Sequence, residues 1–160
     1  HPVWQMYKKE NPIPSLSNTV HKQWFEALDE PGAFQVTYLK NLMLSRPFFS
    51  RRPNQQLIVE NPYDPTGYLT ACSGYGYIFV YIPTGKTVKI KTGLLNAPPI
   101  KVWWFNPRTG DAILEGEREN QAIIEFDPPG ERKRGNDWVL VIDNGSEEFP
   151  KPGMCLGEKP

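Results

Sequence analysis

The pattern of apolar and polar positions changes near residue 55 of this 160-residue chain. Before that point the spacing is helical. A first short helix is predicted over 17–28, where polar N-cap candidates precede apolar residues four positions apart. A second helix is predicted from position 31 to about position 45. Proline fits the first turn of a helix, and the residue before Pro47 disfavours the helical conformation.

After residue 55 the apolar positions follow a period of two, which indicates short strands separated by turns rich in glycine and proline. Segments 77–82 and 138–143 are apolar on both faces, so we expect them to be central strands. The predicted strands are 56–60, 68–73, 77–82, 87–91, 101–106, 111–114, 122–127 and 138–143. The sequence therefore predicts a mainly β fold, an antiparallel β-sandwich of about eight strands preceded by two helices.

This pattern also predicts how the chain is divided. Residues 1–55 form a helical part, residues 56–145 form the sandwich, and residues 146–160 form an irregular tail with three prolines and two glycines. The composition agrees, because 17 prolines and 13 glycines favour many short elements over a helical bundle.

Charge and composition exclude several functional classes. Eighteen basic and 18 acidic residues give no net charge, whereas a nucleic-acid-binding protein normally has a basic excess. No apolar run approaches the roughly 20 residues that span a bilayer, so no membrane span is expected. Hydrophobic residues make up 39% of the chain, enough for a packed core.

Residues for catalysis or metal binding are scarce. The chain has two histidines, His1 and His21, and no metal-binding, phosphate-binding or nucleophile motif. Its carboxylates lie mostly at strand ends and turns, where surface charge is the simpler interpretation. We therefore assign no catalytic residue, no metal ligand and no cofactor. Cys72 and Cys155 are interpreted as two free thiols or, alternatively, as a disulfide that holds the tail.

Aromatic residues are the more informative class. Trp103 and Trp104 are adjacent in one predicted strand, so their side chains point to opposite faces. One of them belongs to the core, and the other lies at an interface with the helical segment or forms an exposed platform for sugar rings. With Trp103, the exposed-platform alternative names Tyr75 and Tyr68 as candidate binding residues.

A basic cluster flanks Pro47-Phe48-Phe49 at the boundary between the two parts. Arg46, Arg51 and Arg52 are expected to pair with nearby carboxylates and so to connect the last helix to the first strand, although such a cluster could also bind an anion.

Several segments together resemble one family. Residues 3–7, 24–33 and 39–47 resemble the end of the catalytic barrel of apiosidase-like glycoside hydrolases. Residues 81–86, 102–110, 126–130 and 137–143 resemble the C-terminal β-sandwich of the same proteins, which carries the label "putative collagen-binding domain". The most specific phrases are WWFNPRTG at 103–110 and DWVLVID at 137–143.

The resemblance implies that the two helices belong to the end of a TIM barrel. It also implies that the catalytic acid and nucleophile lie upstream of residue 1, as would any secretion signal. His1 and Trp4 would then lie near the active-site face of that barrel, which makes them candidate substrate contacts. The implied protein is bacterial, extracellular or periplasmic, and acts on a plant-type polysaccharide.

Two functions follow as hypotheses. In the first, this chain is the non-catalytic accessory sandwich of a glycoside hydrolase, and its partner is the upstream catalytic barrel on which it packs. In the second, it is a stand-alone module that binds carbohydrate or a matrix protein. Activity of this chain by itself is not expected.

Overall fold

The computed structural model of the chain describes residues 6–10, 22–95 and 99–157. The chain divides into two compact units, residues 1–37 and residues 38–160. The boundary falls inside the α-helix α1 (Pro31–Leu44), so this helix contributes residues to both units.

The described part of the first unit contains a short 3₁₀ helix and the first half of α1. Its short 3₁₀ helix η1 (Glu26–Asp29) buries Ala27, and the backbone N–H of Trp24 donates to the carbonyl of Tyr7 at 3.0 Å. The first predicted helix is therefore wrong over 22–25, which is not helical, while residues 17–21 lie outside the described residues. The second predicted helix is confirmed, since α1 begins at Pro31 and ends two residues before Arg46.

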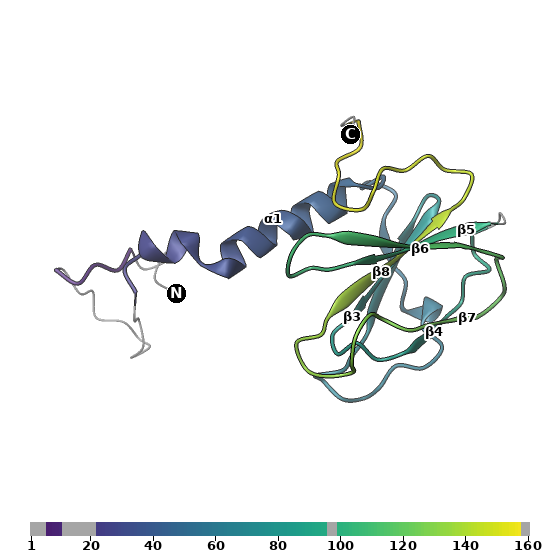
Figure 1. The fold of residues 1–160 in the computed structure, drawn as a ribbon, viewed down its shortest axis with the longest axis horizontal. Helices are drawn as coiled ribbons and strands as arrows, with labels where there is room; N and C mark the ends of the chain where they lie inside the picture. The colour runs from purple at the N-terminus through teal and green to yellow at the C-terminus, as the bar shows by residue number, and fades with distance from the viewer. Residues whose placement is uncertain (1–5, 11–21, 96–98, 158–160) are drawn as a thin grey trace. The chain divides into compact units, whose positions relative to one another are not determined.

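The second unit is a sandwich of two antiparallel sheets (Figure 1). The larger sheet has six strands, in the order β1-β2-β3-β8-β5-β6, and the smaller sheet pairs β4 with β7. The central position of β3 and β8 confirms the interpretation of their two-sided apolar pattern. The strands are β1 (Arg52–Pro53), β2 (Thr70–Gly74), β3 (Tyr77–Ile82), β4 (Val88–Ile90), β5 (Ile100–Phe105), β6 (Ala112–Arg118), β7 (Ile124–Phe126) and β8 (Trp138–Asn144).

The large sheet is covered on both faces. One face packs against the small sheet in a core that contains Trp104 and Phe126. The opposite face carries Trp103 and Phe105, and it packs against Leu42 from the C-terminal half of α1, with Tyr38 and Phe149 beside them. We call this second cluster the helix-side core. Trp103 and Trp104 thus point to opposite faces, as their adjacency predicts.

The first predicted strand, 56–60, is wrong. Its residues form the 3₁₀ helix η2 (Gln55–Leu57), followed by an isolated bridge between Ile58 and Ile90. The reason is that Leu57 and Ile58 are consecutive and both face the same core between the two sheets, whereas a strand would turn them to opposite faces. The short strand β1 takes the edge position beside β2 instead.

The tail has no helix or strand between Asn144 and residue 157, as the sequence predicts. It returns to the sandwich, since Phe149 packs beside the helix-side core and the N–H of Leu156 donates to the carbonyl of Leu44 at 3.2 Å. Gly153 has φ +94° and lies so close to the Phe105 ring that an added Cβ would stand 3.1 Å away. The tail therefore covers part of the sheet face that α1 also covers.

Candidate functional sites

The residues predicted as a sugar-binding platform do not lie together. Trp103 is only 9% exposed and belongs to the helix-side core, so the structure places it at the interface with the helix and not on an open surface. Tyr75 is 70% exposed and Tyr68 is 48% exposed, but they flank opposite ends of β2. Five strand residues rise about 3.3 Å each, so the two rings are far apart. His1 and Trp4 lie outside the described residues.

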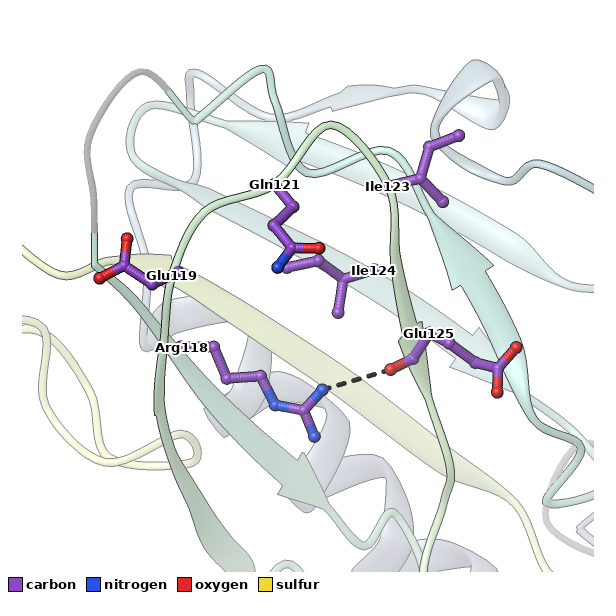
Figure 2. A pocket seen from close by; sticks show the side chains of 6 residues that line it. All are labelled: Arg118, Glu119, Gln121, Ile123, Ile124 and Glu125. Carbon is purple, nitrogen blue, oxygen red and sulfur yellow. Dashed lines mark hydrogen bonds between the residues drawn. The ribbon is translucent and has the colours of Figure 1, made fainter.

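A shallow depression lies on the sandwich between the end of β6 and β7 (Figure 2). It has a volume of about 480 Å³, and its lining residues are Arg118, Glu119, Gln121, Ile123, Ile124 and Glu125. The Arg118 guanidinium donates to the Glu125 carbonyl at 3.2 Å and forms an ion pair with Glu115, so its charge is already paired within the chain.

The two acidic residues of this depression do not form a catalytic pair. In Figure 2 the carboxylates of Glu119 and Glu125 point in opposite directions, so they do not converge on one position in the depression. Glycoside hydrolysis needs two carboxyl groups facing a common bond, about 5–10 Å apart. The depression therefore supplies no geometry for that reaction.

The joint between α1 and the sandwich is the most tightly organised polar feature. The Arg46 side chain, directly after α1, is fully buried and makes a bidentate pair with Asp143 of β8. Nε donates to Oδ1 and Nη2 donates to Oδ2, each at 2.7 Å, while Nη1 donates to the carbonyl of Pro150 at 2.9 Å. One side chain thus connects the helix end, the central sheet and the tail.

Asp143 is the one buried carboxylate among the described residues. Burial raises the pKa of Asp143 above its ordinary value, and the hydrogen bonds and charge of Arg46 offset part of that rise. Taking either charge out of water is costly unless the partner is in place. The pair therefore connects the residue that follows the helix end directly to β8.

Arg51 holds the turn that follows the joint. Its guanidinium carbon lies 4.9 Å from the Phe79 ring centroid and 5.4 Å from that of Phe48, and its Nε donates to the Tyr77 hydroxyl at 2.9 Å. Of the three arginines, Arg46 pairs with a carboxylate as expected, whereas Arg51 stacks on aromatic rings. Exposed Arg52 donates to the carbonyls of Phe49 and Arg51.

Cys72 is a half-buried free thiol on β2, so the alternative in which it forms a disulfide with Cys155 is not seen. Burial raises the pKa of Cys72, and the nearby charge of Arg51 opposes that rise. Within the described ranges, no three His, Cys, Asp or Glu side chains come together as metal ligands. In the same part of the chain, no helix has the length and hydropathy that crossing a membrane requires.

The fold defines a class of protein, an antiparallel β-sandwich in which the C-terminal half of a preceding helix packs against one face of the large sheet. Residues 52–143 match the family described as "Putative collagen-binding domain of a collagenase", and residues 1–50 match the family described as "Apiosidase-like, catalytic domain". The first match spans more than half of the chain, so the chain belongs to the collagen-binding-domain family of that description.

Solved structures agree with both matches. A structure titled "Glycoside hydrolase" superposes with a TM-score of 0.81 at 29% identity, over 93% of this chain and 33% of its own. A glycoside hydrolase family 5 structure from Bacteroides vulgatus ATCC 8482 gives a TM-score of 0.76 at 30% identity, over 82% of this chain and 28% of its own. The chain thus spans about a third of these relatives. No curated protein matches it.

Proposed function

We propose that this chain is the C-terminal end of a longer glycoside hydrolase, in which the sandwich is a non-catalytic accessory domain that holds the last helix of the catalytic barrel. The barrel would precede residue 1, and the substrate would be a plant-type polysaccharide. The family resemblance also supports an extracellular or periplasmic location for the whole protein.

The observation that carries this proposal is that α1 has apolar residues on every side of the helix, with a few polar ones between them. Lys40 is the single charged residue among its 14 residues. A helix that is apolar on all sides is normally buried on all sides. The sandwich covers the face that carries Leu42, with Tyr38 beside it.

Another face of α1 carries exposed apolar residues, since Leu39 is 52% exposed and Val36, one turn away, is more exposed still. The catalytic-domain match includes all of α1 and ends at residue 50, just before the sandwich match begins at residue 52. The domain that supplies the helix is therefore the natural partner for the face that the sandwich leaves open.

The decisive experiment compares one substitution in two contexts, the 160-residue chain and the longer protein with its catalytic part. Leu39→Ser should leave the unfolding temperature of the short chain unchanged. It should destabilise the longer protein by about 2–5 kcal/mol, as truncation of a core leucine does. Ile113→Ser is the matched control, because Ile113 is 50% exposed on β6 and points to the face opposite to Ala112, which belongs to the helix-side core.

Equal, small effects of Leu39→Ser in both contexts would contradict the proposal. An assay of the short chain on plant polysaccharides tests the non-catalytic role, and hydrolysis that a carboxylate substitution abolishes would refute it.

A further inference from the structure

Three exposed aromatic residues lie on two segments that are far apart in sequence and meet beside the joint. Phe48 and Phe49 come from the turn after α1, and Tyr75 comes from the tip of the β2–β3 hairpin. Phe49 is 90% exposed, Phe48 is 52% exposed and Tyr75 is 70% exposed. Ser50 joins the segments, because its Oγ accepts the backbone N–H of Tyr75 at 3.0 Å. We call these three residues the aromatic patch.

The backbone under the patch is fixed in place. The Ser50 hydroxyl also donates to the Pro47 carbonyl at 3.0 Å, and the Tyr77 hydroxyl donates to the same carbonyl at 3.0 Å. The N–H of Arg51 closes the turn by donating to the carbonyl of Phe48 at 3.1 Å. A surface whose backbone is already ordered loses little conformational entropy when a partner covers it.

The ring geometry favours a protein partner over a sugar. The Phe48 and Phe49 rings meet edge to face, with centroids 5.8 Å apart and planes at 84°. Two perpendicular rings present no common flat surface on which successive sugar rings could stack. They form a projecting apolar knob, the shape that fills a pocket in a packed protein interface.

The position of the patch in the chain identifies that partner. Phe48 and Phe49 fall within the catalytic-domain match, which ends at residue 50, while Tyr75 falls within the sandwich match. About two thirds of the length of the related structures is absent from this chain. Resting on the function proposed above, we infer that the aromatic patch is a second contact between the sandwich and the catalytic part of the longer protein, separate from the open face of α1.

Two contacts would have a consequence that one helix alone would not. With α1 alone, the orientation of the sandwich against the barrel would depend on the helix, whereas a second contact on the hairpin tip adds a fixed point outside the helix. The partner surface would be an apolar pocket of the catalytic domain, which receives Phe49 and lies against the ring of Tyr75.

Hydrogen–deuterium exchange, measured on the 160-residue chain and on the longer protein, tests this contact. Backbone amides of residues 49–51 and 74–76 should exchange at least about tenfold more slowly in the longer protein. Equal exchange in the two proteins would overturn the inference. Protection that appears only after a plant polysaccharide is added would also overturn it, and would assign the patch to a glycan.

Substitutions give an independent readout. Phe49→Ser and Tyr75→Ser should each lower the unfolding temperature of the longer protein while leaving that of the short chain unchanged. Tyr63→Ser is the control, because Tyr63 is fully exposed on the loop before β2, at the end of that strand opposite to Tyr75. Equal effects of Tyr63→Ser and Tyr75→Ser in the longer protein would count against a contact.

The outcomes separate this inference from the proposed function. If Leu39→Ser destabilises only the longer protein and the patch amides are unprotected, the barrel covers α1 but not the patch, and this inference alone falls. If neither effect appears, both fall.

Discussion

Removing Arg46 should test whether the joint depends on a buried charge pair. In Arg46→Leu the Asp143 carboxylate would remain buried between the sheet and the tail without its two 2.7 Å hydrogen bonds. Breaking a buried ion pair from one side costs about 3–5 kcal/mol, because the remaining charge is uncompensated. The carbonyls of Ser45 and Pro150 also lose the donor Nη1, which places the cost toward the upper end of that range.

The assay is urea and thermal unfolding of the parent chain and the variant. For a chain of this length, 1 kcal/mol shifts the unfolding temperature by about 2–4 °C, so the expected decrease is about 6–20 °C. Arg46→Lys is the matched control, since lysine keeps the charge but not the planar two-pronged geometry. Arg46→Lys should therefore lose some stability, but less than Arg46→Leu.

The same variant should change how stability depends on pH. Without Arg46, the pKa of Asp143 in the folded chain rises further above its value in the unfolded chain, because only the smaller effects of Lys101 and Trp103 then oppose burial. A carboxyl group with a raised folded pKa holds its proton more tightly when folded. The variant is therefore most stable below the unfolded pKa and loses stability as the pH rises toward the folded pKa.

We expect the stability gap between parent and variant to widen as the pH rises from about 4 to about 7. Asp143→Asn removes the titrating group, so the unfolding free energy of that variant should lack the pH dependence that Asp143 contributes in that window. A difference in stability between the parent and Arg46→Leu below about 1 kcal/mol, the size expected for an exposed ion pair, would refute the reasoning. A difference that does not change with pH would also refute it.

Two further predictions concern the same side of the large sheet. Gly110→Ala should cost more stability than Gly135→Ala. Both glycines have positive φ, +79° and +84°, but only at Gly110 would the new Cβ meet a ring, because it would stand 2.6 Å from Cδ1 of Tyr38. Equal losses of stability in urea unfolding would argue against a close fit of α1. Cys72 should react slowly with iodoacetamide at pH 8 and at the rate of an ordinary thiol in urea, because burial raises its pKa. Peptide-level mass spectrometry measures both rates, and equal rates would show that the thiol is accessible in the folded chain.

Much of the fold could be predicted because its elements have strong local signals. The central strands β3 and β8 are apolar on both faces, and α1 begins at a proline that suits a first turn. Where local and tertiary preferences differ, the prediction failed. Leu57 and Ile58 have strand-like composition, but the chain forms a 3₁₀ turn there, which allows both side chains to be buried.

The candidate site was predictable only in part. Pattern alone placed Trp103 and Trp104 on opposite faces, yet it could not decide which face would be open, because that depends on where α1 and the tail pack. The Arg46 partner lies 97 residues away in sequence, and no local spacing identifies such a pair. The aromatic patch was equally hidden, since Phe49 and Tyr75 become neighbours only through the hydrogen bond at Ser50.

The alternation of the strands, the turns between them, the second helix and the family could all be predicted from the amino-acid sequence. Each of these features depends on a local periodicity or on a short specific motif. The tertiary structure decided which apolar surfaces are covered and which remain open. Burial depends on contacts between distant segments, and the free energy of those contacts is absent from any local pattern. For this reason the buried Trp103 and the exposed Phe49 could be told apart only once the chain was folded.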